Sequence, residues 1–141
     1  MSPLHIEVLD PIKLPLVARL YKAYYPSGKA KKDELVVAGY CESQIAAAVR
    51  FRHLEQHRLL TGMLVVPEHR GKGWGHKLMS YCVEQILKES DYCFAYQHLE
   101  GFYAQHGFQT VASEQLPNSL KSLFERYSRT KKLIPMQYVP S

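Results

Sequence analysis

The sequence predicts an α/β fold in which helices flank one mixed β-sheet. Two observations lead to this prediction. Short apolar runs, typical of strands, alternate with segments in which apolar residues recur every three or four positions, which is typical of helices. The resulting order, β-α-β-β-β-α-β-α-β-α-β, places an antiparallel meander in the middle and parallel crossovers after it. Because 141 residues are the size of one domain, we expect residues 1–141 to form a single domain.

Each element of the N-terminal part follows from its own pattern. Residues Leu4–Leu9 alternate as a strand does, and apolar residues at helical spacing predict a helix over Leu14–Tyr25. Two runs that are apolar on both faces, Leu35–Cys41 and Ile45–Phe51, predict a hairpin inside a covered sheet. The charged run Lys29–Lys32 is interpreted as a solvated loop.

The second part begins with a nearly unbroken apolar strand, Leu59–Val66. Trp74 opens a long amphipathic helix that we expect to end near Ser90 and Asp91. The remaining expected elements are a strand at Tyr92–Tyr96, a short helix at Leu99–His106, a strand at Phe108–Val111, a helix starting at Pro117 and a last strand at Leu133–Val139. Pro135 in the last strand predicts an edge or a bulge there, because proline cannot donate to a sheet ladder.

Composition and charge exclude several classes of protein. Hydrophobic residues make up 46% and charged residues 22%, which is typical of globular domains and excludes disordered or collagen-like chains. The apolar runs fall well below the ~20 residues of a membrane-spanning helix, and the start of the chain shows no secretion signal. We therefore expect a cytoplasmic protein with no membrane partner. The net charge of +5 suits an anionic partner, either nucleic acid or a phosphorylated small molecule.

The cysteines predict neither disulfides nor a metal site. Cys41, Cys82 and Cys93 form no CxxC pair, and we expect reduced thiols packed as small hydrophobes. No Cys or His residues have zinc-finger spacing, so we expect no metal.

The segment with the clearest chemistry joins the apolar strand to the long helix. Between Arg70 and His76 three glycines alternate with other residues. Glycine lets backbone N–H groups approach a ligand closely, and the free N–H groups and dipole of a helix N-terminus attract anions. Arg70 and Lys72 add positive charge. Together these features predict a pocket for a phosphate or diphosphate group.

Two familiar phosphate-binding patterns do not fit this loop. A dinucleotide fingerprint would need glycine at His76, and no GxxxxGK[ST] pattern occurs here. The pattern that fits, [Q/R]-x-x-G-x-[G/A] at Arg70, Gly73 and Gly75, resembles the acetyl-CoA loop of the GNAT acetyltransferase superfamily. A second stretch, Phe-Tyr-x-x-x-Gly-Phe over residues 102–108, is similar to one that follows the fifth strand in many of these enzymes. The element order also agrees, so the resemblance spans nearly the whole chain.

The resemblance implies a mostly antiparallel central sheet whose fourth and fifth strands splay apart at the coenzyme A site. Acetyl-CoA would be the co-substrate. Its pantetheine arm would bind backbone groups of Met63, Leu64 and Val65, with the N–H of Val65 holding the thioester oxygen. Its diphosphate would bind the glycine loop, mainly through backbone N–H groups, and the residues of this site are Arg70, Gly71, Lys72, Gly73, Trp74, Gly75 and His76.

The resemblance also assigns Tyr103 to catalysis, as the proton donor to the departing thiolate. A phenol of pKa about 10 can protonate a thiolate of pKa about 8.5 if the two are hydrogen-bonded. The amine acceptor must lose a proton, but the glutamate that many relatives place on the fourth strand is missing from Leu59–Val66. Nearby titratable residues are interpreted as solvated turn residues, so no general base is assigned: His53, Glu55, His57, His98 and Glu100.

The predicted function is acetyl transfer from acetyl-CoA to a primary amine, of a small molecule, protein or peptide, by direct attack in a ternary complex. No cysteine nucleophile is needed. The residues expected around the acceptor are Tyr24, Tyr25, Arg50, Arg52 and Tyr96. One alternative is a catalytically inactive coenzyme A-binding or sensor module of the same fold. A nucleic-acid binder ranks well below it, because Lys and Arg are scattered along the chain. Exposed strand edges in this fold often pair between protomers, so the analogy leaves a homodimer open.

Overall fold

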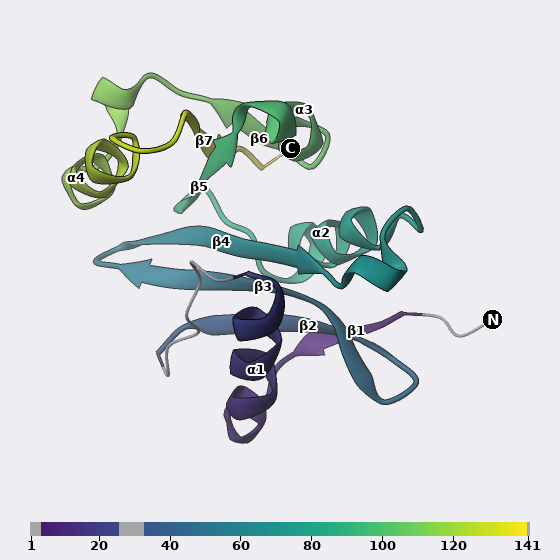
Figure 1. Ribbon diagram of the computed structural model, residues 1–141. Helices are drawn as coiled ribbons and strands as arrows, with labels where there is room; N and C mark the ends of the chain where they lie inside the picture. Colours follow the sequence, from purple (N-terminus) through teal and green to yellow (C-terminus); the bar gives the residue numbers. More distant parts are fainter. Residues whose placement is uncertain (1–3, 26–32, 141) are drawn as a thin grey trace.

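Seven strands form one sheet in the order β1-β2-β3-β4-β5-β7-β6 (Figure 1). The computed structural model describes residues 4–25 and 33–140, so the predicted Lys29–Lys32 loop lies outside the described residues. The strands are β1 His5–Val8, β2 Leu35–Cys41, β3 Gln44–Leu54, β4 His57–Val65, β5 Asp91–Tyr96, β6 Phe108–Thr110 and β7 Leu133–Tyr138. The α-helices are α1 Leu14–Tyr24, α2 Trp74–Gln85, α3 Glu100–Ala104 and α4 Asn118–Tyr127.

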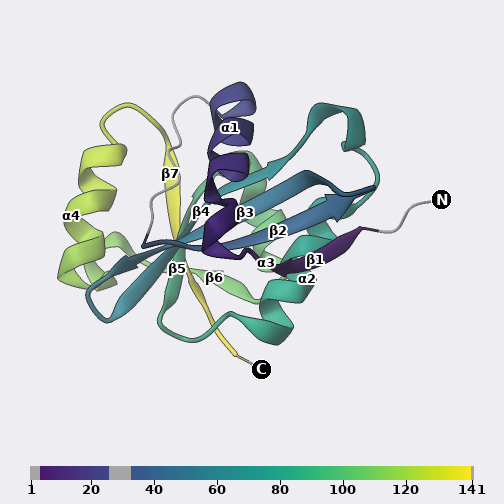
Figure 2. The same ribbon diagram turned by 90° about the horizontal axis from the view of Figure 1, so that it is seen from below.

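Helices cover both faces of the sheet, as Figure 2 shows. Because side chains alternate along a strand, neighbouring residues of β2 and β3 enter different cores. Val37 and Val49 pack with residues of α2 on one face, whereas Val36 and Ala48 pack with Val17 of α1 on the other. A separate cluster places α4 on the C-terminal half of the sheet, on residues of β4 and β5. The predicted covered hairpin of β2 and β3 is confirmed.

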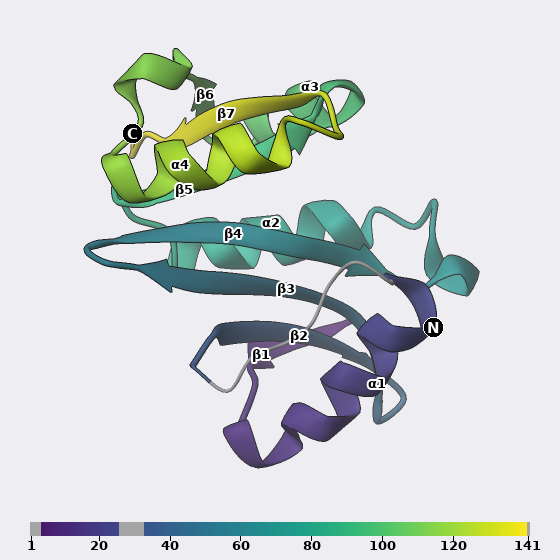
Figure 3. The same cartoon turned by 60° about the vertical axis from the view of Figure 1, so that its left-hand side comes forward.

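The sheet opens between β4 and β5. These two strands pair in parallel through three residue pairs, from Arg58 with Asp91 to Leu60 with Cys93. Beyond them β4 continues to Val65 and β5 to Tyr96, but the two strands no longer pair with each other, and Figure 3 shows the two halves of the sheet diverging there. The predicted mostly antiparallel sheet with a splayed strand pair is therefore confirmed.

Two details of the expected topology are wrong. Among the described strands, β4 and β5 form the one parallel pair, and β6 and β7 join the sheet antiparallel instead of by further crossovers. Helix α2 ends at Gln85 rather than near Ser90, because the N–H groups of Ile86 and Leu87 both bond to the carbonyl of Cys82 and the chain turns away. Asp91 then starts β5, although the apolar periodicity continues through Leu87.

Pro135 is in an interior strand and not at an edge, since β7 lies between β5 and β6. Its carbonyl accepts a hydrogen bond from Val111 N at 3.0 Å. The nitrogen of a strand residue faces the same side as its carbonyl. The missing N–H of Pro135 therefore points to the β6 side, where β6 has already ended at Thr110, and no bond to β5 is lost.

Candidate active site

A pocket of about 420 Å³ lies where β4 and β5 separate. Five consecutive residues of β4, from Leu59 to Met63, form one wall, and residues 93–96 of β5 form the opposite wall. Tyr103 of α3 lines the pocket from one face of the sheet, while Arg50 and Arg52 of β3 line it from the other. The opening thus connects the two faces of the sheet, which lets two reactants meet from opposite sides.

A β-bulge at Gly62 shapes the β4 wall. The pairing of β3 with β4 shifts register between Ala48 and Arg50, and Gly62 has a φ of 65°. The phenol of Tyr21 donates a hydrogen bond of 2.6 Å to the Gly62 carbonyl. A Cβ at Gly62 would lie 2.8 Å from Nε of Arg50, so both the backbone conformation and the neighbouring side chain require glycine here.

Replacing Gly62 with alanine is expected to lower the free energy of unfolding by about 1–3 kcal/mol, because a non-glycine residue at positive φ is strained. Urea unfolding measures this change. Gly101→Ala is the matched control, since a Cβ at Gly101 meets no atom within 4 Å and the residue lies in α3. Equal stability of the two variants would contradict the assigned bulge.

Beyond the bulge, backbone groups of β4 face the opening. The N–H of Val66 bonds to the Ala46 carbonyl of β3 at 2.9 Å. Because the backbone direction alternates along a strand, Leu64 also points to β3, whereas Met63 and Val65 point toward β5. Of the three residues predicted to contact the pantetheine arm, Met63 and Val65 thus direct backbone groups at the opening and Leu64 does not.

The glycine loop leads from β4 into α2. Gly73 is the N-cap of α2, with a φ of 77° and no side-chain hydrogen bond to the cap. The first intrahelical bond runs from Lys77 N to the Gly73 carbonyl, so the N–H groups of the first turn point out of the helix. A Cβ at Gly71 or Gly73 would meet no atom within 4 Å. This geometry leaves an open concave backbone at a helix N-terminus, suited to an anion.

The two cationic side chains of the loop bend back onto the protein. Arg70 Nε donates to the Val65 carbonyl at 3.1 Å. Lys72 Nζ lies 3.0 Å from His69 Nδ1 and 5.1 Å from the centroid of the Trp74 ring. Trp74, which the resemblance placed in the diphosphate site, is buried in one cluster with Val66 and anchors the helix. The part of this loop that stays open to a ligand is therefore mainly its backbone.

The first turn of α2 also contacts α3. His76 Nδ1 lies 2.9 Å from His106 Nε2, and the His76 ring packs on Phe102. Burial, and then the neighbouring His76, lower the pKa of His106 below its usual value. The contact fixes α3, and with it Tyr103, relative to the glycine loop.

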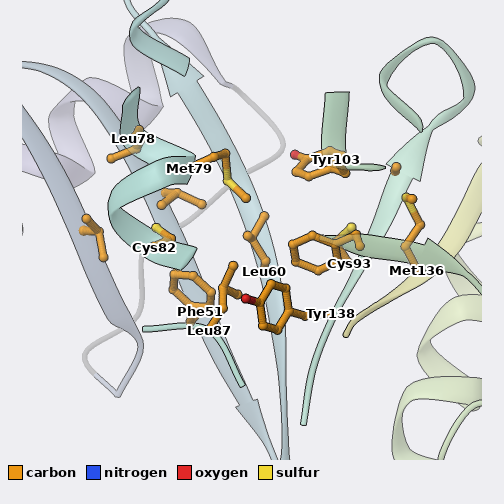
Figure 4. Close-up of a cluster of buried hydrophobic side chains, with 14 of the residues drawn as sticks. Phe51, Leu60, Leu78, Met79, Cys82, Leu87, Cys93, Tyr103, Met136 and Tyr138 are labelled. Carbon is orange, nitrogen blue, oxygen red and sulfur yellow. The ribbon is translucent and has the colours of Figure 1, made fainter. Parts of the chain in front are cut away.

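Tyr103 occupies the pocket wall on the α3 side. Its side chain is 6% exposed and lies among residues of the main core. Figure 4 shows the phenol oxygen on the side of the ring that faces the strand carrying Leu60. Burial raises the pKa of Tyr103 well above its usual value, so the hydroxyl keeps its proton throughout the neutral range and remains a hydrogen-bond donor.

The acceptor side of the pocket contains most of the residues predicted for it. Tyr25, Arg50, Arg52 and Tyr96 line the pocket, and Tyr24 is not part of its lining. The lining residues that the sequence analysis did not assign to the site include Glu34, Tyr127 and Lys131. They come from segments far apart in the sequence, and no local motif marks them.

Glu34 and Arg50 form a buried ion pair in this pocket. Arg50 Nη1 lies 3.0 Å from Glu34 Oε1, and the side chains are 6% and 2% exposed. The guanidinium also stacks 4.8 Å from the centroid of the Tyr21 ring. The five titratable residues interpreted as solvated turn residues do not occur in the described lining, in which Glu34 is the one carboxylate.

The cysteines are free, and two of them are buried. Cys93 lines the pocket, but burial raises the pKa of its thiol, which therefore stays protonated and is a poor nucleophile. Burial likewise raises the pKa of Cys82 to about 12. Among residues 4–25 and 33–140, no group of three or more His, Cys, Asp or Glu side chains is arranged to hold a metal ion.

A mostly antiparallel sheet that opens between its fourth and fifth strands, beside a glycine-lined helix start, defines the acyl-CoA N-acyltransferase fold. The sequence matches the acetyltransferase (GNAT) domain family over residues 31–110, which is more than half of the chain. The chain therefore belongs to the GNAT acetyltransferase family.

Solved structures agree with this fold. N-acetylglutamate synthase from Neisseria gonorrhoeae, complexed with coenzyme A and N-acetyl-glutamate, is similar with a TM-score of 0.76 and 12% identity, over 100% of this chain and 36% of that chain. Escherichia coli ElaA has a TM-score of 0.69 and 17% identity, over 99% of this chain and 100% of that one. The Escherichia coli ribosomal-protein-S18-alanine N-acetyltransferase has a TM-score of 0.68 and 13% identity, over 99% and 95%.

The chain spans only about a third of the N-acetylglutamate synthase chains it resembles, 36% and 34% in two structures. No curated protein sequence matched the chain. Within the part of the chain that the structure describes, no helix is long and apolar enough to cross a membrane.

Proposed function

We propose that this protein transfers the acetyl group of acetyl-CoA to a primary amine by direct attack in a ternary complex. The observation that supports this most is the pocket between β4 and β5, because Tyr103 of α3 lines it on one side and the polar residues Arg50 and Arg52 line it on the other. A coenzyme bound from the loop and an amine bound from the opposite face would meet beside Tyr103.

The coenzyme would bind largely to backbone groups. Its diphosphate would accept hydrogen bonds from N–H groups of residues 71–76, at the N-terminus of α2. Its pantetheine arm would extend along the part of β4 that does not pair with β5, next to Met63 and Val65. A backbone N–H of this pair would hold the thioester oxygen as it becomes negative, and such a preorganised donor typically lowers a barrier by ~3 kcal/mol.

The reaction then requires one attack and two proton movements. The amine nitrogen forms a bond to the thioester carbon, and the carbon–sulfur bond breaks as the tetrahedral intermediate collapses. The amine gives up a proton, which water carries to Tyr103, and the departing thiolate receives the phenol proton of Tyr103. Burial raises the pKa of Tyr103, so the phenol carries its proton when the thiolate forms; because the phenol is then a weaker acid, the transfer requires a direct hydrogen bond to the sulfur.

Replacing Tyr103 with phenylalanine tests this proposal. We expect kcat to fall about tenfold or more, because a general acid typically contributes at least this much. The affinity for coenzyme A should not change, since the ring is retained. Coenzyme A release with a panel of amines measures the rate, and calorimetric titration with coenzyme A measures binding.

Tyr138→Phe is the matched control. Tyr138 is also 6% exposed and belongs to the same core cluster, but it does not line the pocket. Equal rates for Tyr103→Phe and Tyr138→Phe would show that the Tyr103 hydroxyl takes no part in the reaction. Absence of turnover in the unaltered protein with every amine class, despite coenzyme A binding, would support the inactive sensor module instead.

A further inference from the structure

We infer that the acceptor is a small amine that carries a carboxylate, such as a free amino acid, and that Arg52 and Lys131 bind this carboxylate. The inference depends on the proposed acetyl transfer and specifies its acceptor. It starts from the charges of the pocket. The described lining contains three cations, Arg50, Arg52 and Lys131, and one carboxylate, Glu34.

The charge of Arg50 is balanced within the protein. Its ion pair with Glu34 is buried, and its guanidinium stacks on Tyr21. The pair positions the Gly62 bulge, because a Cβ at Gly62 would meet the Arg50 side chain. Arg50 and Glu34 thus shape the pocket, and the positive charge left for a ligand comes from Arg52 and Lys131.

Arg52 has capacity for an anion. Within residues 4–25 and 33–140 it makes one hydrogen bond, from Nη1 to the phenol of Tyr127 at 3.3 Å, and no ion pair. A guanidinium has five N–H donors arranged to bind a carboxylate in a bidentate manner. The half-buried Arg52 therefore presents charged N–H donors to the pocket. Most of these donors form no hydrogen bond with a described protein group.

The end of α4 and the residues after it add positive charge to the pocket. Residues 126–132, from the last turn of α4 to the residue before β7, contain four basic residues and no acidic residue. Lys131 is the basic residue among them that lines the pocket, and the other three are exposed outside the lining. Positive charge in the lining attracts anionic ligands and repels polyamines and simple ammonium ions.

The spacing also fits an amino acid. Arg52 pairs with Leu59 of β4, and the chemistry is expected near Met63, four residues further along the same strand. That separation is roughly 13 Å of strand. An arginine side chain extended toward Met63 would cover part of it, and a small amino acid with its carboxylate toward Arg52 and its amine toward Met63 would cover the rest.

A positive pocket also helps the amine react. Nearby cations disfavour the ammonium form and so lower the pKa of a bound amine. Because β4 has no glutamate to accept the proton of the amine, a lower pKa that leaves more of the amine neutral helps the reaction. The carboxylate of the acceptor then supplies the attraction that the ammonium group cannot.

The experiment compares acceptors in matched pairs with the full-length protein and acetyl-CoA. Alanine is paired with alaninamide and lysine with cadaverine, and phosphoethanolamine tests a phosphate in place of the carboxylate. We expect at least a tenfold higher kcat/KM for alanine than for alaninamide, although the amide has the more easily deprotonated amine, and for lysine than for cadaverine. Arg52→Gln and Lys131→Gln should each raise KM for the carboxylate-bearing acceptor about tenfold, and Arg52→Lys should recover part of the loss.

Lys132→Gln is the matched control, because Lys132 has the same charge, is adjacent in sequence, and lies outside the pocket lining. Its KM should stay within about twofold of the unaltered protein. Equal rates within the pairs, a preference for cadaverine or phosphoethanolamine, or equal effects of Lys131→Gln and Lys132→Gln would each overturn the inference.

Calorimetric titration of the coenzyme A-bound protein with the same acceptors separates the two proposals. Carboxylate-selective binding that Arg52→Gln abolishes would support this inference even if no acetyl group moved, and would then count against the proposed function alone. Transfer to amines regardless of their carboxylate would support the proposed function and overturn this inference.

Discussion

Replacing Arg58 with methionine is expected to lower the free energy of unfolding by about 3–5 kcal/mol, because it leaves a buried carboxylate without its cation. Arg58 holds Asp91 through two charged bonds, from Nε to Oδ1 at 2.6 Å and from Nη2 to Oδ2 at 2.7 Å. Asp91 is fully buried, and Arg58 also donates to the Ile86 carbonyl at 2.8 Å. Urea unfolding monitored by circular dichroism measures the change.

This ion pair lies at the closed end of the opening in the sheet. Arg58 and Asp91 are the first of the three parallel pairs that join β4 to β5. The pair therefore keeps the strands together at one end while they separate at the other. Arg129→Met is the control, since Arg129 is exposed and makes no ion pair with a described residue. A loss below about 1 kcal/mol for Arg58→Met, as for an exposed pair, would contradict this role.

The Arg58–Asp91 pair also shows where sequence reasoning ends. Periodicity located every strand and helix of the described chain within a few residues, because it reports which side of a local element is buried. It could not show that two residues 33 positions apart lie opposite each other, because that depends on how the crossover through α2 returns the chain. Periodicity also placed the end of α2 too late. Leu87 is apolar and packs in the core, but it does so from a turn after the helix.

The candidate site likewise has one part that the sequence predicts and another part that it does not. The glycine loop is contiguous in sequence, so its pattern was sufficient to predict an anion-binding corner, and the structure places it at the start of α2. The acceptor side is assembled from Tyr25 after α1, Glu34 before β2, strands β3 and β5, and the chain from the end of α4 onward. Arg52 was predicted from the family fold, whereas Glu34 and Lys131 have no local signature that distinguishes them from other surface charges.

Replacing Gly73 with valine is expected to raise the Kd for coenzyme A about 100-fold, equivalent to about 2.7 kcal/mol. Gly73 has a φ of 77°, which strains a β-branched residue, and its Cβ would point into the open space where the diphosphate is expected. The distorted backbone would misdirect the N–H groups of the first turn of α2. Calorimetric titration with coenzyme A measures the affinity, and thermal unfolding checks that the variant is folded.

Two comparisons localise this effect to the diphosphate. Acetylpantetheine lacks the diphosphate, so its affinity should be the same for Gly73→Val and the unaltered protein. Lys72→Gln should change the Kd for coenzyme A no more than about threefold, because the Lys72 side chain is held against His69 and Trp74 and the exposed charge adds little. A loss for Lys72→Gln as large as that for Gly73→Val would show that side-chain charge, and not the backbone at the helix N-terminus, binds the coenzyme. If Gly73→Val weakened the binding of acetylpantetheine and coenzyme A equally, the substitution would act on the β4 opening and not on the diphosphate site.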